Sequence, residues 1–433
     1  MRFKVFKNTV LLFVLVVVSC AGKVGSEKLE VRSETDSSNV LRQAQHDTLI
    51  GMNEIIIGSN RTEVYLPLLK GKRVGVVANQ TSVIFKEIAT SRKKNETRND
   101  SSFVHLVDSL LYLNINIKKV FSPEHGFRGT ADAGENVKDG VDTKTGLPIF
   151  SLHGKHKKPT AEQLEDLDII IFDIQDVGVR FYTYISTLHY VMEACAENNV
   201  PLLILDRPNP NGNYVDGPVL EKEHSSFLGM HPIPLVHGMT IGEYAQMING
   251  EGWLEDNAKC EITVVEMENY NHDSFHSLPI RPSPNLPNDQ SIMLYPSLGL
   301  FEGTNINAGR GTEFQFQRYG APFLDSSYYE FSYTPQPNFG SKYPKHKGEV
   351  CYGADLSNVK PERKFTLKYV MDAYNHATDK SKVFNTANFT KHAGTAKLQQ
   401  QIEAGLSEAE IRATWKKGLV DFKKTRAKYL IYD

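Results

Sequence analysis

The chain has 433 residues, 40% hydrophobic and 23% charged, and its 49 Lys and Arg against 51 Asp and Glu give a formal net charge of −2. This length suits two domains, and the balanced charge excludes a general electrostatic attraction for nucleic acid or anionic lipid. The 31 Gly and 20 Pro are ordinary contents, which excludes a fibrous or broadly disordered protein.

Residues 1–20 have the pattern of a secretion signal. A basic start precedes the apolar run Val10–Val18, which is too short to span a bilayer. The tetrad Val17-Val18-Ser19-Cys20 resembles a bacterial lipobox, which predicts lipidation of Cys20; an ordinary signal peptide is the alternative. Residues 21–47 are polar and lack apolar periodicity, so we expect a disordered tether. The sequence therefore predicts a secreted lipoprotein on the periplasmic face of a membrane, and Ala21 favours the outer membrane.

Apolar runs alternate with helical patterns from residue 73 to residue 265, which predicts an α/β fold with a mostly parallel sheet. Strands are expected at 73–78, 117–121, 168–173, 202–205 and 260–265, with a weaker candidate at 234–236. Helices are expected at 103–112, after a capping box at Thr160, at 183–198, and from a second capping box at Thr240 to about Gly250.

A domain boundary is expected in the Pro-rich segment 281–288, which has no periodicity. It separates an N-terminal domain, 48–281, from a smaller C-terminal domain, 282–433. The last predicted helix begins at a capping box formed by Ser407 and Glu410, and its apolar face contains Ile411, Trp415, Leu419 and Phe422. The remaining cysteines lack CxxC spacing, so we expect them to be small buried hydrophobic residues: Cys195, Cys260 and Cys351.

Polar residues directly follow each predicted strand. The segments concerned are 79–82, 122–129, 173–184, 206–212 and 237–239. Because ligands of open α/β sheets bind beyond the carboxyl ends of the strands, these segments predict a polar cleft at that edge.

The motifs of several enzyme classes are absent from the chain. We find no GxGxxG after a strand, no GxxxxGK[ST], no HExxH and no GxSxG, which disfavours dinucleotide enzymes, P-loop enzymes, zincin proteases and nucleophile-elbow esterases. The carboxylates, histidines and tyrosines that remain suit acid–base chemistry on a polar, anionic substrate. Arg180, Arg207 and Arg310 are candidates to bind an acidic group of that substrate.

Glu124 is the leading candidate for acid–base work because it follows Ser122-Pro123 at a strand end, where proline fixes the backbone. The alternative is that Glu124 only pairs with Arg128 or caps a helix. Asp173 and Asp176 are expected to satisfy loop amides, with one of them pairing with Arg180.

These segments resemble the bacterial exo-β-N-acetylmuramidases, a glycoside hydrolase family long described as a domain of unknown function. The resemblance rests on Ser-Pro-Glu-His-Gly-Phe-Arg-Gly (122–129), the 173–184 block, Leu-Asp-Arg-Pro-Asn-Pro (205–210) and Thr-Asn-Ile-Asn-Ala-Gly-Arg-Gly-Thr-Glu (304–313), and it covers about residues 50–433. It implies a Rossmann-like N-terminal domain, a smaller α+β C-terminal domain and a cleft between them. It also implies release of N-acetylmuramic acid from the non-reducing end of peptidoglycan fragments, without a cofactor.

The resemblance places the family's glutamate at Glu124, which we expect to be the general acid. The second group is either a carboxylate, with Asp176 the first candidate and Glu313 the second, or the substrate's own acetamido group. The residues expected to bind substrate are His125, Arg128, Arg180, Tyr182, Asp206, Arg207, Asn209, His237, Asn307 and Arg310.

Two other functions remain open from the sequence. A non-catalytic lipoprotein that binds muropeptides or wall sugars would use the same cleft. A metal-dependent hydrolase would be built on Glu124, His125 and His237.

Overall fold

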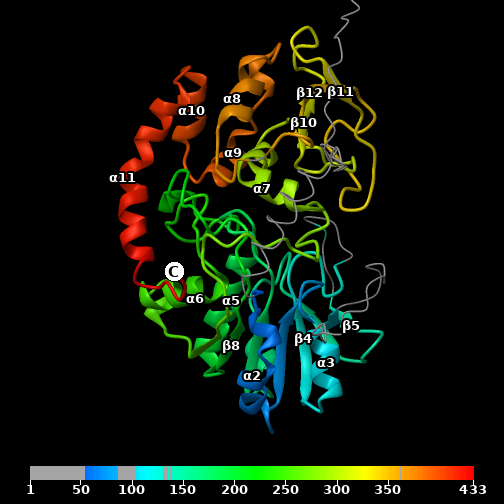
Figure 1. Cartoon of the computed structure of the whole chain (residues 1–433), viewed down its shortest axis with the longest axis vertical. Helices are drawn as coiled ribbons and strands as arrows, with labels where there is room; N and C mark the ends of the chain where they lie inside the picture. The colour runs from blue at the N-terminus through cyan, green and yellow to red at the C-terminus, as the bar shows by residue number, and fades with distance from the viewer. Residues whose placement is uncertain (1–53, 86–102, 130–134, 136–138, 361) are drawn as a thin grey trace, which may run out of the picture. The chain divides into compact units, whose positions relative to one another are not determined.

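The computed structural model describes residues 54–85, 103–129, 135, 139–360 and 362–433. Its centre is a seven-stranded sheet of order β5-β6-β4-β1-β7-β8-β9 (Figure 1). The six parallel strands are β1 (Val74–Ala78), β4 (Ile117–Ser122), β6 (Pro148–Ser151), β7 (Ile169–Asp173), β8 (Leu202–Leu205) and β9 (Ile262–Val265). The short β5 (Gly140–Val141) pairs antiparallel with β6 at one edge. The α/β fold with a mostly parallel sheet is therefore confirmed.

Helices cover both faces of this sheet, which explains why its central strands are continuous apolar runs. On one face, α2 (Thr62–Leu69) and α3 (Leu106–Tyr112) pack against alternate strand residues such as Val76 and Ile171. The other face, which includes Val77 and Ile170, packs against α4 (Ala161–Leu164), α5 (Tyr184–Asn198) and α6 (Ile241–Gly250). The carboxyl ends of the parallel strands thus meet at one edge of a sheet that is closed on both sides.

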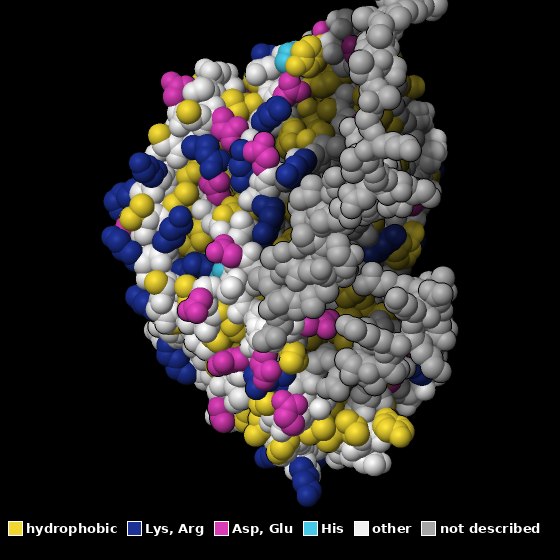
Figure 2. Space-filling model, in the orientation of Figure 1, with side chains coloured by type: hydrophobic (Ala, Val, Ile, Leu, Met, Phe, Trp, Pro, Cys, Tyr) yellow, Lys and Arg dark blue, Asp and Glu magenta, His cyan; other side chains and the backbone are white. Residues whose placement is uncertain are grey.

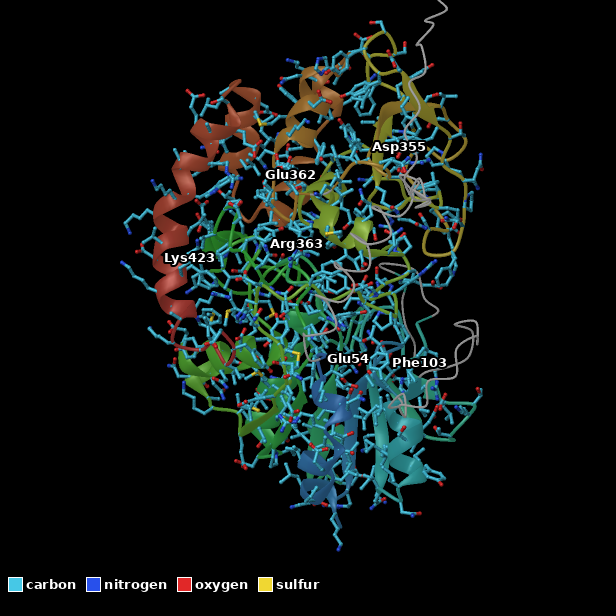
Figure 3. The ribbon with its side chains drawn as sticks, viewed as in Figure 1. Glu54, Phe103, Asp355, Glu362, Arg363 and Lys423 are labelled. Carbon is cyan, nitrogen blue, oxygen red and sulfur yellow. The ribbon has the colours of Figure 1, made fainter. Side chains whose placement is uncertain are left out.

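The described residues of the C-terminal part form a small antiparallel sheet and five α-helices. The sheet has the order β10-β12-β11, formed by β10 (Arg318–Ala321), β11 (Phe331–Tyr333) and β12 (Cys351–Asp355). The helices are α7 (Asp289–Leu298), α8 (Lys368–Asn375), α9 (Thr386–Ala393), α10 (Lys397–Glu403) and α11 (Glu408–Arg426), with the 3₁₀ helix η4 (Gly299–Gly303) directly after α7. Asp355, at the end of β12, lies far from Glu54 and Phe103 in the sheet part (Figure 3).

Several predicted elements differ from those found. The segment 103–112, predicted as one helix, begins as strand β3 (Phe103–His105), which pairs with β2 (Val83–Phe85) before α3 starts. The candidate strand at 234–236 is wrong, since Val236 forms only isolated bridges. The prediction of a helix from Thr240 to about Gly250 is confirmed by α6, but Gly250 is its last residue and not the glycine that ends it, since the left-handed backbone belongs to Gly252, at φ +67°. The prediction for the cysteines is confirmed, because Cys195, Cys260 and Cys351 are buried free thiols.

Helix α11 joins the two parts, running alongside the sheet part down to the C-terminus (Figure 1). Its buried face presents Ile411, Trp415 and Phe422. Lys and Arg side chains gather along the edge of the molecule that α11 forms, whereas acidic and basic groups are mixed over the coloured surface next to it (Figure 2). No helix within the described ranges is long and apolar enough to cross a bilayer. Cys20, the signal sequence and the tether lie outside the described residues.

Candidate active site

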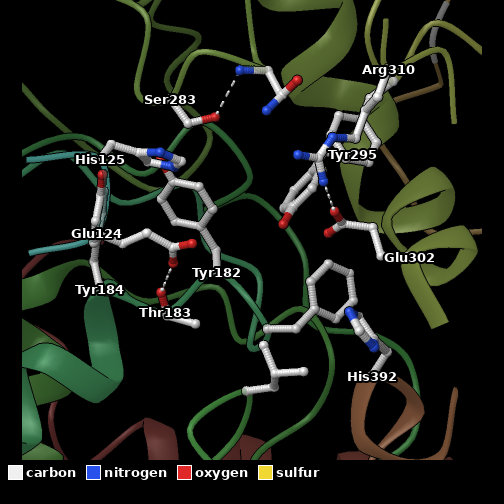
Figure 4. Close-up of a pocket in the computed structure, with 14 residues that line it drawn as sticks. Glu124, His125, Tyr182, Thr183, Tyr184, Ser283, Tyr295, Glu302, Arg310 and His392 are labelled. Atoms are coloured by element: carbon white, nitrogen blue, oxygen red, sulfur yellow. Dashed lines mark hydrogen bonds and ion pairs between the residues drawn. The ribbon is translucent and has the colours of Figure 1, made fainter. Parts of the chain in front are cut away.

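A cavity of about 280 Å³ lies beyond the carboxyl edge of the sheet and is lined by residues from both parts of the chain (Figure 4). We call it the site cavity. Its walls are formed by Glu124, His125, Phe181, Tyr182, Thr183, Tyr184, Leu228, Ser283, Asn285, Tyr295, Glu302, Arg310, Phe316 and His392. It combines two carboxylates, one guanidinium, two imidazoles and many aromatic rings.

Glu124 reaches the site cavity from the turn that follows β4. The turn is sharp, since His125 and Gly126 both have left-handed backbones, at φ +71° and +81°. The hydroxyl of Thr183 donates a hydrogen bond to Glu124 Oε2 at 2.9 Å. Thr183 immediately precedes α5, where a threonine hydroxyl often caps the helix, but here it makes no cap and holds the glutamate instead. The structure therefore fixes this carboxylate through a second element.

Glu302 enters the site cavity from the opposite wall, and its carboxylate faces that of Glu124 (Figure 4). It lies in η4 and forms an ion pair with Arg310, whose Nη1 is 2.9 Å from Glu302 Oε1. Behind it, the ammonium group of Lys345 donates to the carbonyls of Phe301, Glu302 and Thr304. Burial lowers the pKa of Lys345 to about 8. This clamp fixes the backbone that presents Glu302.

Aromatic rings form much of the remaining wall. Tyr182 packs edge-to-face against both Tyr184 and Tyr295, with centroids 4.9 and 5.9 Å apart, and its hydroxyl donates to the carbonyl of Pro282 at 2.7 Å. Burial raises the pKa of each of these tyrosines, so their hydroxyls stay neutral donors at ordinary pH. Such a wall suits the apolar faces of a sugar ring while leaving polar groups for its hydroxyls.

Four of the predicted site residues meet in this cavity: Glu124, His125, Tyr182 and Arg310. The others lie elsewhere. Glu313 is exposed and accepts a hydrogen bond from Asn338, and Arg128 forms ion pairs with Asp108 and Asp142. Asn307 donates to the carbonyls of Arg310 and Lys345 and lines a neighbouring cavity.

Asp176 does not line the site cavity. It is 5% exposed, and its Oδ2 accepts a hydrogen bond from the backbone of Gly178 at 2.7 Å. Burial raises its pKa to about 7. The nearest imidazole is that of His237, whose Nε2 lies 3.8 Å from Asp176 Oδ2. Burial, followed by the charges of Arg426 and Arg180, lowers the pKa of His237 to about 3.

Arg180 has no exposed surface, and its guanidinium donates to the backbone carbonyls of Pro218, Ile233, His392 and Ala393. Burial lowers the pKa of Arg180 to about 9. The expectation that Asp173 or Asp176 pairs with it is wrong. The position of Arg180 also corrects its assignment to the sugar-binding wall, because every described contact of the guanidinium is to main-chain oxygen.

Arg207 is the partner of Asp173, with its Nε 2.5 Å from Asp173 Oδ1, and both side chains are buried. Asp206 accepts hydrogen bonds from the hydroxyls of Thr240 and Tyr432, and burial raises its pKa to about 6. Asn209 donates to the carbonyl of Met239. These strand-end polar residues bind other loops of the sheet part and, through Asp206, the C-terminal Tyr432; they do not line the site cavity.

Carboxylates and imidazoles close enough to share a metal ion occur at two places in the described part of the chain. The two groups are Glu221, Glu223 and His224, and Glu193, Glu197 and Glu255. Neither contains a residue of the site cavity, and His237 does not line that cavity with Glu124 and His125.

Sequence reasoning did not find Glu302, Ser283, Asn285, Tyr295 or His392. Ser283 and Asn285 belong to the Pro-rich segment that we interpreted as a boundary, and Glu302 sits in a short 3₁₀ helix without a strand before it.

Models of one protein family match nearly the whole described part of this chain. The model described as "Exo-beta-N-acetylmuramidase NamZ, N-terminal" matches residues 74–290, and its C-terminal counterpart matches residues 293–432. The chain belongs to this family.

Known members resemble the chain over most of its length. The peptidoglycan β-N-acetylmuramidase NamZ of Bacillus subtilis (strain 168) is 41% identical over 392 residues, covering 85% of this chain and 89% of that protein. Two crystal structures of DUF1343 family proteins from Bacteroides fragilis NCTC 9343 are also similar. One is 42% identical with a TM-score of 0.77 and the other 29% identical with a TM-score of 0.72; each alignment covers 88% of this chain and 99% of the other.

Proposed function

We propose that this chain is an exo-acting β-N-acetylmuramidase, which hydrolyses the glycosidic bond of N-acetylmuramic acid at the non-reducing end of peptidoglycan fragments. The observation that carries the proposal is the pair of carboxylates, Glu124 and Glu302, on opposite walls of one cavity (Figure 4). Most glycoside hydrolases use two carboxylates that flank the scissile bond. Family membership, and the muramidase activity in the name of the Bacillus subtilis relative, support the choice of substrate.

In the proposed reaction Glu124 is the general acid. Its proton passes to the glycosidic oxygen as the bond from that oxygen to the anomeric carbon breaks, and positive charge develops on the sugar ring. Glu302, held on the opposite wall by its ion pair with Arg310, is the carboxylate that stabilises this charge. Water supplies the hydroxyl group for the anomeric carbon, and its remaining proton restores Glu124 to the acid form.

The size of the site cavity supports exo action. At about 280 Å³ it lies just below the range for small-molecule sites, which is about 300–1,000 Å³. A pocket of this size accommodates a terminal residue and not a stretch of glycan chain. A long open groove would be expected of an enzyme that cuts within the chain.

The test uses the protein without residues 1–20 and a chromogenic β-N-acetylmuramide. Glu124→Gln removes the proton that the leaving oxygen needs, and we expect kcat to fall by about 10³-fold or more. Glu302→Gln removes the charge that faces the sugar, and we expect a loss of about 10²-fold or more.

Glu313→Gln is the matched control, because Glu313 is an exposed glutamate nearby in sequence that lines neither cavity. It should keep full activity with an unchanged circular dichroism spectrum. Near-normal turnover by a folded Glu124→Gln variant would contradict the proposal. Saturable binding of the muramide without turnover in the unmodified protein would favour a binding lipoprotein instead.

We also propose that the chain is exported and anchored to a membrane, on the side where cell-wall fragments occur, through lipid on Cys20. The lipobox-like tetrad and the polar segment 21–47 support this. Expressed in a bacterium, the full chain should fractionate with membranes and carry a lipid mass on its N-terminal peptide. Cys20→Ser should release the protein from the membrane fraction. An unlipidated mature N-terminus other than Cys20 would overturn the anchor.

A further inference from the structure

A second cavity, of about 260 Å³, shares Glu302 and Arg310 with the site cavity. Its other walls include Ile306, Ala308 and Tyr343. Tyr343 is 89% exposed, so the mouth of this second cavity is open to solvent. A substrate in the site cavity therefore has Arg310 at its side and a further chamber beyond that arginine.

Arg310 is the one Lys or Arg among the described residues that line the site cavity. The other two arginines considered for an acidic substrate group are occupied elsewhere: Arg180 by four carbonyls and Arg207 by Asp173. Lys345, which lines the second cavity, directs its ammonium group to three backbone carbonyls. Among these cations, Arg310 is thus the one placed to meet a substrate anion.

Not all N–H groups of the Arg310 guanidinium are used in hydrogen bonds within the described residues. Its Nη1 pairs with Glu302 at 2.9 Å, whereas its Nη2 makes a long contact of 3.4 Å to the carbonyl of Gly340. Its Nε is buried and has no hydrogen-bond partner among the described residues, and each Nη carries a second N–H group. A guanidinium carries five N–H groups, so that of Arg310 can donate to a second carboxylate while it keeps its bond to Glu302.

We infer that Arg310 binds the carboxylate of the lactyl group on the muramic acid, and that the second cavity receives this substituent. The inference rests on the proposed function. The lactyl ether is the group that distinguishes N-acetylmuramic acid from N-acetylglucosamine, and it combines a carboxylate with a methyl group. Arg310 matches the carboxylate, and the apolar side chains of Ile306 and Ala308 match the methyl group. Arg310 is thus the residue that selects muramic acid.

The experiment compares the chromogenic β-N-acetylmuramide with its lactyl methyl ester, in the unmodified protein and in Arg310→Gln. Esterification removes the anion from the substrate, and the substitution removes the cation from the protein. We expect each change alone to lower kcat/KM by about 10²-fold, as for a charge-assisted pair. In Arg310→Gln, esterification of the substrate should then lower kcat/KM by less than threefold. Because this last ratio is taken within one variant, a folding defect cancels from it.

Lys342→Gln is the matched control. Lys342 stands between Ser341 and Tyr343, which line the second cavity. Its own side chain pairs with Glu135 and lines neither cavity. It should respond to esterification as the unmodified protein does. An equal penalty for esterification in Arg310→Gln and in the unmodified protein would overturn the assignment of Arg310.

The second cavity is tested by filling it and measuring binding by calorimetry. Ala308→Leu should weaken binding of free N-acetylmuramic acid by tenfold or more and leave binding of N-acetylglucosamine unchanged. Equal weakening of both sugars, or of neither, would overturn the subsite. Because this titration needs no turnover, a protein that hydrolyses neither chromogenic sugar refutes the proposed function and still decides the subsite.

Discussion

Asp176 carries a carboxyl group that is almost completely removed from water. One of its oxygens accepts a backbone hydrogen bond from Gly178, and the other is buried without a described partner. Desolvation raises its pKa from an ordinary 3.8 to about 7. Between these two values the folded protein binds a proton here that the unfolded chain releases, so the stability contributed by this group is present at acid pH and is lost as the pH rises through 7.

We therefore predict that Asp176→Asn removes a pH dependence of stability. Between pH 5 and pH 8 the free energy of unfolding of the unmodified protein should fall, relative to the variant, by an amount on the order of 2 kcal/mol. Asp206, with its pKa raised to about 6, titrates in both proteins and cancels from the comparison. Urea unfolding at the two pH values gives the measurement.

The same variant addresses the role of Asp176 in the reaction. Because Asp176 does not line the site cavity, we expect Asp176→Asn to keep kcat/KM within tenfold of the unmodified protein, in contrast to Glu302→Gln. A stability difference that is constant with pH would show that Asp176 is ionised in the folded protein. A loss of activity as large as that of Glu124→Gln would contradict this prediction and restore Asp176 as a candidate catalytic residue.

At the scale of elements, the features that could be predicted are those encoded in a few adjacent residues. The capping boxes predicted at Thr160, Thr240 and Ser407 are all present, with both reciprocal hydrogen bonds formed. The buried strands could also be predicted from the sequence, because a strand covered on both faces is a continuous apolar run. The strand at the start of the 103–112 segment could not be predicted in this way, since it forms through pairing with β2.

The residues of the site also divide into those that a local motif predicts and those that only tertiary packing brings together. Glu124 was found because it stands in a rigid motif at a strand end, where a parallel sheet places its ligands. Glu302, Tyr295 and His392 come from η4, α7 and α9, and these elements meet Glu124 only through packing of the C-terminal part over the sheet edge. No local pattern encodes that meeting. Arg180 shows the converse: its place in a strand-end loop suggested a ligand-binding group, whereas complete burial makes it a support for main-chain carbonyls.

On the scale of the whole molecule, the described contacts tie the C-terminal part to the sheet part at several separate points. Arg180 donates to the carbonyls of Pro218 and Ile233 on one side and of His392 and Ala393 on the other. At the end of the chain, the Tyr432 hydroxyl donates to Asp206 at 2.8 Å. One hydrophobic core also runs through both parts, from the strands of the sheet to Trp415 of α11. Neither part can unfold without exposing groups that the other covers.

We therefore predict that residues 54–433 unfold in one cooperative transition. The two tryptophans report on the two parts separately: Trp253 follows α6 and stacks on His231, and Trp415 lies in α11. In Trp253→Phe the fluorescence follows the C-terminal part alone, and in Trp415→Phe it follows the sheet part alone. In each variant the urea midpoint by fluorescence should coincide with the midpoint by circular dichroism, which follows the whole backbone.

Comparison within a variant is the control, because each substitution shifts the midpoint by its own cost in packing. If the C-terminal part unfolded first, Trp415 fluorescence in Trp253→Phe would change at a lower urea concentration than the circular dichroism signal, and the prediction would fail.

Arg180→Gln is a further test, since it leaves buried carbonyls of both parts unpaired. It should lower both midpoints together, by several tenths molar urea or more, and should not separate them. Because the site cavity takes its walls from both parts, coincident midpoints mean that the site is lost only with the fold itself.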